Sequence, residues 1–244
     1  MKAKDVMTRP VISIEPDMSV QQAAQLMLQR RISGLPVIDK SGRLVGIVTE
    51  ADFLRRAETR TQRRRARWLE FLMGPGRLAD EYVHTHGRKV KEVMTPDPQT
   101  VPEDCPLDEV VRLMEKRRIK RLPVTRADQV IGIVSRANLL HALASVGSDV
   151  KSPTPNDEAI RERLLAKLSK QNWAPLALIN IVVHNGIVEL WGTITDERER
   201  QAIVVAAENI SGVKAVRDHL AWVDAMSGMM FYPSDEQEQA KAKT

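Results

Sequence analysis

An internal repeat constrains the fold of this chain more than any other feature. Residues 6–54 align with residues 93–140 when one gap is placed at Gly42, and 17 of the 48 aligned positions are identical. The stretch GIVTEAD in the first copy matches GIVSRAN in the second. A unit of roughly 50 residues buries too little surface to be stable alone, so we expect the two copies to pack together as a pair.

Apolar spacing predicts the elements of each copy. From Val20 to Met27, apolar residues recur at the i, i+3, i+4 and i+7 positions of one helix face, and Leu107 to Met114 repeat this pattern in the second copy. LPVID and LVGIVT are short β-rich runs separated by the turn residues KSG. Each copy therefore reads strand–helix–strand–strand–helix, which predicts an α+β fold built on a pseudo-two-fold pair.

These motifs resemble the CBS domain, which occurs in tandem pairs called Bateman modules. The marks are VMT near a proline, an amphipathic helix, LPV, and then Gly-apolar-apolar-Thr/Ser-x-x-Asp/Asn, in that order in both copies. The resemblance assigns residues 1–57 and 91–146 to the two repeats. It implies a regulatory module that binds an adenosine-type ligand such as AMP, ADP, ATP or S-adenosylmethionine, with no covalent cofactor.

In such a family the last motif is similar to a ribose clamp. Thr49 ends a strand and Asp52 lies in the first turn of the next helix, so a hydroxyl and a carboxylate face one crevice. A carboxylate accepts two hydrogen bonds, which suits the 2′ and 3′ hydroxyls of a ribose. Ser135 and Asn138 replace this pair in the second copy, and we expect the uncharged amide to form the weaker clamp. The alternative is a capping box that only starts a helix.

The resemblance also assigns residues outside this motif. Thr8 and Thr95 line the base and ribose side, and Val11 offers an apolar wall, although core packing explains Val11 equally well. Lys120 and Arg121 occupy a position that meets nucleotide phosphate, where the first copy has uncharged residues. The full set of nucleotide-binding candidates is Thr8, Val11, Thr49, Asp52, Thr95, Lys120, Arg121, Ser135 and Asn138.

A basic insert, residues 58–90, separates the repeats. Between residues 55 and 91 there are 11 Lys/Arg against 4 Asp/Glu, and five of the eight residues 60–67 are arginine. Such a segment could contact nucleic acid or an anionic membrane. The alternative is a helix with a charged surface, whose apolar side covers the CBS pair or a partner subunit.

The character of the chain changes after a linker at residues 147–156. Residues 157–224 read helix–strand–strand–helix–strand, with NG at 185–186 as a hairpin signal. VELWG, ISGVKAV and DHLAWV resemble the BON domain, a family associated with binding of anionic phospholipid. This region carries 8 Lys/Arg against 10 Asp/Glu, so we favour a protein-interaction role over lipid binding. We expect residues 225–244 to form a disordered tail.

Composition narrows the functional classes. The chain shows no nucleophile–base pairing, P-loop, Rossmann glycine pattern or metal-ligand spacing, which argues against an enzyme and a metal site. The single cysteine excludes an intramolecular disulfide, and the charged N-terminus without a signal peptide favours the cytoplasm. We therefore expect a non-catalytic, homodimeric sensor that signals through its BON domain or an unidentified protein partner. The alternatives are a membrane-associated scaffold and a nucleic-acid-binding regulator.

Overall fold

A computed structural model describes residues 1–54, 76, 82–145, 154–224 and 229–231. The chain divides into two compact units, which we describe separately. The first-repeat unit comprises residues 12–99 and 127–130. The second-repeat unit comprises residues 1–11, 100–126 and 131–244, and so includes the C-terminal domain.

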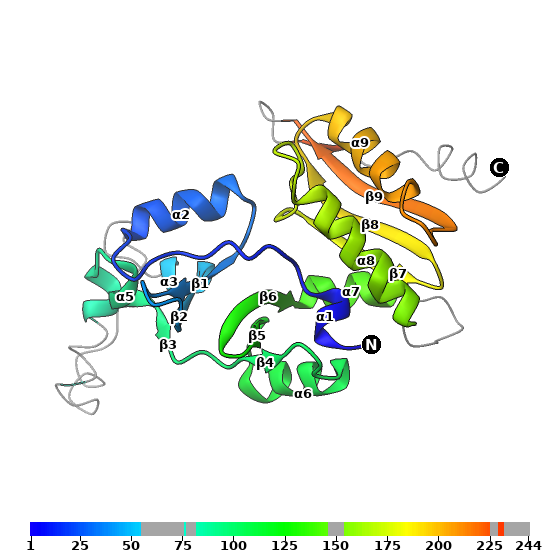
Figure 1. Ribbon diagram of the computed structural model, residues 1–244. Helices are drawn as coiled ribbons and strands as arrows, with labels where there is room; N and C mark the ends of the chain where they lie inside the picture. The colour runs from blue at the N-terminus through cyan, green and yellow to red at the C-terminus, as the bar shows by residue number, and fades with distance from the viewer. Residues whose placement is uncertain (55–75, 77–81, 146–153, 225–228, 232–244) are drawn as a thin grey trace. The chain divides into compact units, whose positions relative to one another are not determined.

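The first-repeat unit is a small helix-and-sheet layer (Figure 1). Its elements are α2 (Val20–Gln29), β1 (Gly34–Ile38), β2 (Leu44–Thr49), α3 (Glu50–Phe53), α5 (Val90–Val93) and β3 (Thr95–Pro96). The strands form an antiparallel sheet in the order β1-β2-β3. Helix α2 begins where the Ser19 hydroxyl accepts a hydrogen bond from the Gln22 amide at 3.1 Å. Its apolar face packs on β1 and β2, as the spacing predicts.

The second-repeat unit begins with a matching layer. Its elements are α1 (Ala3–Val6), β4 (Val101–Pro102), α6 (Leu107–Arg117), β5 (Arg121–Arg126), β6 (Gln129–Ser135) and α7 (Arg136–Ser145). The strand order is β4-β5-β6, and β4 pairs with β5 in parallel. The predicted strand–helix–strand–strand–helix order is found in the second repeat. In the first repeat, where residues 1–19 are all described, no strand precedes α2, and Ile14 forms only a single parallel bridge with Val37. The fold is α+β, as predicted.

The segments that carry VMT pack in the cores of the opposite repeats. Ala3, Val6 and Met7 are buried in the core of the second repeat, whereas Val90 and Val93 are buried in the core of the first. The sequence did not predict this arrangement. The alignment pairs equivalent residues but cannot tell whether a short helix packs on its own repeat or on the other copy.

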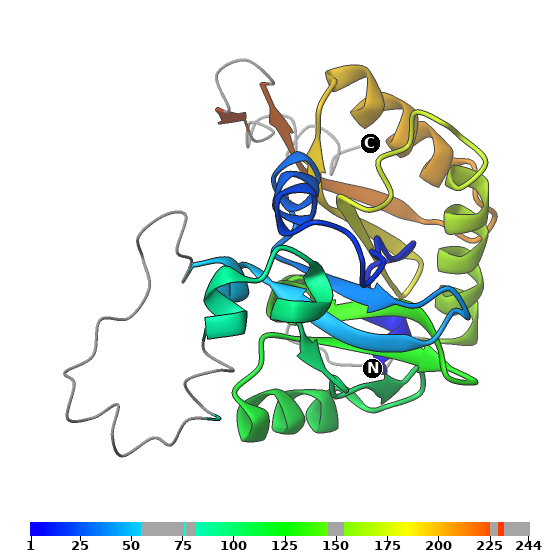
Figure 2. The same cartoon turned by 90° about the vertical axis from the view of Figure 1, so that its left-hand side faces the viewer.

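The C-terminal domain has the predicted helix–strand–strand–helix–strand order. Its elements are α8 (Pro155–Leu168), β7 (Ile179–His184), β8 (Ile187–Ile194), α9 (Glu197–Glu208), β9 (Ala215–Val223) and β10 (Met230–Phe231). The sheet order is β10-β9-β8-β7, and α8 and α9 cover one face of it (Figure 2). At the hairpin turn, Asn185 and Gly186 have φ of 53° and 80°, the left-handed conformation that NG predicts.

Two residues of the expected tail form a short strand, β10. Met230 and Phe231 pair with Val223 and Trp222 at the edge of the sheet. The rings of Phe231 and Trp222 stack with their centroids 5.0 Å apart. This pairing and the aromatic contact extend the sheet beyond the expected end of the domain at residue 224.

The C-terminal domain packs against the second repeat. Strand β7 is buried along its whole length. Ile179, Ile181 and Val183 join the core under α8 and α9, and α1 and α7 lie against the same strand. A strand buried on both faces needs cover on both sides. The expected separation at residues 147–156 is therefore not observed as a division between compact units, although residues 146–153 lie outside the described part.

Candidate functional site

In the first repeat, the predicted clamp residues lie in direct contact. The amide and hydroxyl of Thr49 donate hydrogen bonds to Oδ2 of Asp52 at 2.7 and 3.0 Å. Strand β2 ends at Thr49 because helix α3 begins at the next residue, and the carboxylate binds the amide at that helix start. One carboxylate oxygen is thus committed to the local fold.

The second oxygen of Asp52 has a different environment. Oδ1 lies 3.7 Å from Nε2 of His84, which is ion-pair distance but too long for a hydrogen bond. The side chains of Asp52 and His84 are 16% and 41% exposed. The sequence does not reveal this proximity, because 32 positions separate Asp52 from His84 and no motif connects them.

In the second repeat, the equivalent residues are closed into an internal network. The amide and hydroxyl of Ser135 both donate to Oδ1 of Asn138 at 2.7 Å. The Asn138 amide nitrogen donates to Oγ1 of Thr8 at 3.0 Å, and Asn138 is only 4% exposed. Both the oxygen and the nitrogen of the Asn138 side chain therefore form hydrogen bonds within the protein.

The C-terminal domain contains a third copy of the same contact. Thr154 donates from its amide and hydroxyl to Oδ2 of Asp157, both at 2.8 Å. The other oxygen, Oδ1, accepts from the Gly186 amide at 2.7 Å, so both oxygens are used. Burial alone would raise the pKa of Asp157, but these hydrogen bonds outweigh burial and lower it. The Thr/Ser-x-x-Asp/Asn contact therefore marks a helix start in all three places. The other polar atom of the Asp or Asn side chain distinguishes them, because it is Oδ1 in Asp52 and Asp157 and the amide nitrogen in Asn138.

The remaining candidates fall into both units. Thr8 pairs with Ile133 on β6, beside Ser135 and Asn138, and Thr95 pairs with Ile47 on β2, the strand that ends at Thr49. The structure thus combines the MT threonine of one copy with the clamp of the other. Val11 is half-buried, Lys120 is exposed, and Arg121 begins β5 and is half-buried. The arginine cluster at residues 60–67 lies outside the described residues.

Family models agree with this architecture. The CBS domain model matches residues 3–58 and 90–145, and the BON domain model matches residues 156–224. The uncharacterized protein MJ1426 of Methanocaldococcus jannaschii is 31% identical over 154 residues, which are 59% of this chain and 91% of that protein. The chain belongs to the CBS domain family. Its C-terminal domain is a BON domain, which confirms both resemblances.

Other CBS proteins show how far the similarity extends. The chloroplastic CBS domain-containing protein CBSX2 of Arabidopsis thaliana is 30% identical over 151 residues, covering 58% of this chain and 62% of that protein. This chain thus spans less than two thirds of that relative. A crystal structure of CBSX2 in complex with AMP matches with a TM-score of 0.52 at 31% identity, over 59% of this chain and 97% of that one. Among the described residues, no helix is long and apolar enough to cross a membrane.

Proposed function

We propose that this CBS–BON protein is a non-catalytic sensor that binds an adenosine-type ligand at the Thr49/Asp52 motif of its first repeat. The ligand class is AMP, ADP, ATP or S-adenosylmethionine. The observation that carries the proposal is Oδ1 of Asp52, which makes no hydrogen bond within the capping motif and belongs to a side chain that is 16% exposed. A matching solved protein, CBSX2, holds AMP, which supports the class of ligand.

The chemistry of the site favours a ribose. Oδ1 of Asp52 is an ionisable acceptor that can take hydrogen bonds from sugar hydroxyls, while Oδ2 keeps the carboxylate fixed through Thr49. Thr95 is exposed on the neighbouring strand and adds a hydroxyl. His84 lies beside the carboxylate, with its Nε2 3.7 Å from Oδ1 of Asp52.

Asn138 is the weaker candidate for a different reason from the one expected. The sequence suggested that its lack of charge would weaken a clamp. The structure adds that its amide group already donates to Thr8 and that the residue is buried. A ligand at this position would have to break contacts that stabilise the fold. We therefore assign Asn138 mainly to stability and Asp52 mainly to binding.

Titration calorimetry of the wild-type protein with AMP, ADP, ATP and S-adenosylmethionine tests the function. Asp52→Ala should weaken binding by about 10-fold or more, since a hydrogen bond to an ionised group contributes roughly 1.5–3 kcal/mol. Asn138→Ala is the matched control and should change the affinity much less. Binding weaker than about 1 mM by the wild type, or only ~4 kcal/mol, would remove the sensor proposal. Unchanged binding by Asp52→Ala would leave Thr49 and Asp52 as a helix cap.

Self-association forms a second part of the proposal. Leu140 and Leu143 lie three residues apart on α7 and are 65% and 72% exposed. Residues at this spacing share one face of a helix, so they form an apolar surface suited to a second copy of the chain. Light scattering should report a homodimer, and Leu143→Glu should shift it toward the 27.5 kDa monomer. A wild type that is monomeric at micromolar concentration would contradict this.

A further inference from the structure

Arg161 on α8 of the BON domain is a buried cation that binds only backbone carbonyls in the contacts described. Its Nε donates to the Ile181 carbonyl at 2.8 Å, within the BON domain. Its Nη1 and Nη2 donate to the carbonyls of Lys4 and Met7 at 2.9 and 2.8 Å. The residue is 5% exposed. One side chain thus connects segments that lie more than 150 positions apart in the sequence.

The carbonyls explain why an arginine stands there. Lys4 belongs to the four-residue helix α1, and Met7 follows its end. The last carbonyls of a helix have no partner within it, and a cationic side chain can supply one. Burial, with a smaller contribution from Arg9, lowers the pKa of Arg161 to about 10, so the guanidinium remains charged at neutral pH. The BON domain therefore provides the C-terminal cap of a CBS helix.

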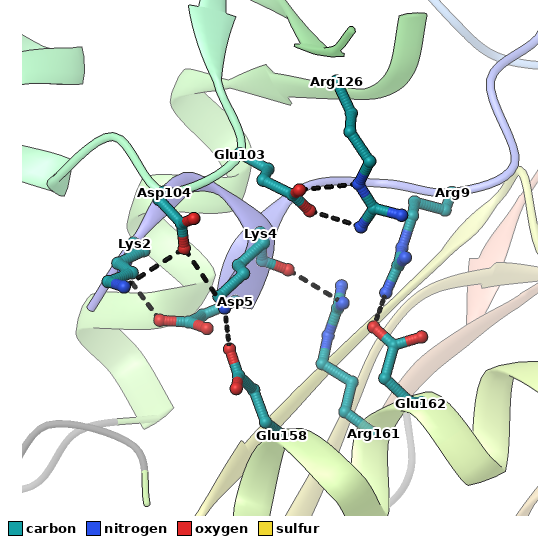
Figure 3. Close-up of polar contacts among 10 residues, drawn as sticks. All are labelled: Lys2, Lys4, Asp5, Arg9, Glu103, Asp104, Arg126, Glu158, Arg161 and Glu162. Carbon is teal, nitrogen blue, oxygen red and sulfur yellow. Dashed lines mark hydrogen bonds and ion pairs between the residues drawn. The ribbon is translucent and has the colours of Figure 1, made fainter. Parts of the chain in front are cut away.

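Ion pairs flank this contact on the same face of α8 (Figure 3). Glu158 pairs with Lys4, and Glu162 pairs with Arg9. The Glu158 contact, followed by that of Asp104 against an opposing effect of burial, raises the pKa of Lys4 to about 12. Both carboxylates reach solvent, whereas Lys4 and Arg9 are partly buried, so water screens each pair in part and each contributes modestly. The buried, charged hydrogen bonds of Arg161 are the stronger restraint on the segment.

The segment at residues 4–8 also contacts the Ser135/Asn138 motif of the second repeat. The amide of Thr8 donates to the Ile133 carbonyl at 2.9 Å, and the Ile133 amide donates back to Thr8 at 3.2 Å. The Thr8 hydroxyl accepts from Asn138. Arg161 binds the carbonyl of Met7, and this carbonyl belongs to the same planar peptide group as the Thr8 amide that donates to Ile133. Displacement at one end of this peptide group is therefore transmitted to the other.

We propose that Arg161 is a positioning residue through which the BON domain fixes Thr8 against the Ser135/Asn138 motif of the second CBS repeat. A partner that moves α8 would change this contact. By reciprocity of linked equilibria, an event that disturbs Asn138 would change how α8 is held. The inference concerns the fold of the free protein, so it stands apart from the nucleotide proposal.

Hydrogen exchange of the full chain without nucleotide tests the inference. In Arg161→Met, the amides of Thr8 and Ile133 should exchange roughly 10-fold faster or more, because the segment opens locally. The amides of the β7–β8 hairpin should keep their protection and thereby report an intact BON domain. Arg163→Met is the matched control, since Arg163 is exposed and its Nε binds Ala159 in its own helix. Wild-type exchange at Thr8 and Ile133 in Arg161→Met would overturn the proposal.

Two further variants separate positioning from general stabilisation. Thr8→Val removes the hydroxyl that accepts from Asn138. If Arg161 acts through Thr8, the double variant Arg161→Met/Thr8→Val should accelerate exchange at Ile133 by less than the product of the single effects. Independent, multiplicative effects would contradict the proposal. Should Arg161→Met fail to fold, Arg161→Lys replaces it: one ammonium cannot reproduce the three-carbonyl contact, and unaltered exchange at Thr8 would again overturn the inference.

Discussion

The two CBS repeats share their backbone framework and differ in their polar groups. Thr95 pairs with Ile47 in one unit as Thr8 pairs with Ile133 in the other. The closing residue of the clamp, however, is Asp52 in the first repeat and Asn138 in the second. Oδ1 of Asp52 binds no backbone group in its motif, whereas the side-chain amide of Asn138 donates a hydrogen bond to Thr8. In the function that we propose, the two copies keep one fold while Asp52 serves ligand binding and Asn138 serves stability.

The shared framework can be broken at a glycine in each repeat. A Cβ on Gly132 would lie 2.2 Å from Sδ of Met7, and a Cβ on Gly46 would lie 2.4 Å from Sδ of Met94. Met7 is fully buried, whereas Met94 is half-buried and has more room to move. Gly132→Ala should therefore destabilise by about 1–3 kcal/mol, and Gly46→Ala by less. Urea unfolding measures both. An equal or larger cost for Gly46→Ala would show that the burial of the methionine does not set the penalty.

The division between stability and binding can be tested at the clamp itself. Asn138 is itself buried, and Asn138→Ala leaves the half-buried Ser135 groups and the Thr8 hydroxyl without their partner, which should cost about 1–3 kcal/mol of unfolding free energy. Asp52→Ala removes a partly exposed cap and should cost about 1 kcal/mol or less. Thermal and urea unfolding measure both costs, and Asn138→Ala should be the more destabilising variant. In nucleotide affinity the order should be reversed, with the larger loss in Asp52→Ala. The same order in both measurements would contradict the division.

The BON helix start offers a third version of the motif, in which both carboxylate oxygens are used. The pKa of Asp157 is lowered in the folded protein, so its ionised form contributes stability above the usual carboxyl pKa, and that stability is lost as the pH falls through the lowered value. We expect BON stability to decline below about pH 4. Asp157→Asn should flatten this decline, because the amide does not titrate in this range. Unfolding at pH 7, 4 and 3 checks it, and an equal decline in the variant would assign the acid sensitivity to other groups.

Much of the fold could be predicted from the sequence because both repeats carry the same local signals. Helix spacing, the LPV strand and the NG turn each specify an element that the structure contains. Contacts that depend on long-range packing could not be predicted from these signals. His84 beside Asp52, the exchange of the VMT segments and the three carbonyls at Arg161 join positions that no pattern connects. Ser135 and Asn138 looked like a weaker clamp because sequence shows charge but not burial.

The smallest expected effect concerns phosphate recognition. Lys120 precedes β5 in the second repeat, where the first repeat has Ser33, so only the second copy carries a cation at this position. The side chain is exposed, and an exposed ion pair contributes about 0.2–1 kcal/mol. Lys120→Ala should therefore weaken the binding of ATP and ADP only a few-fold, roughly 1.5- to 5-fold, and leave adenosine binding unchanged.

Ser33→Lys is the matched variant that adds a positive charge to the first repeat, and it should strengthen ATP binding relative to adenosine binding. Calorimetry in low and high salt compares them, because screening should reduce both differences. An equal loss for ATP and adenosine in Lys120→Ala would show that this lysine does not contact phosphate, and that charge at this position does not distinguish the repeats.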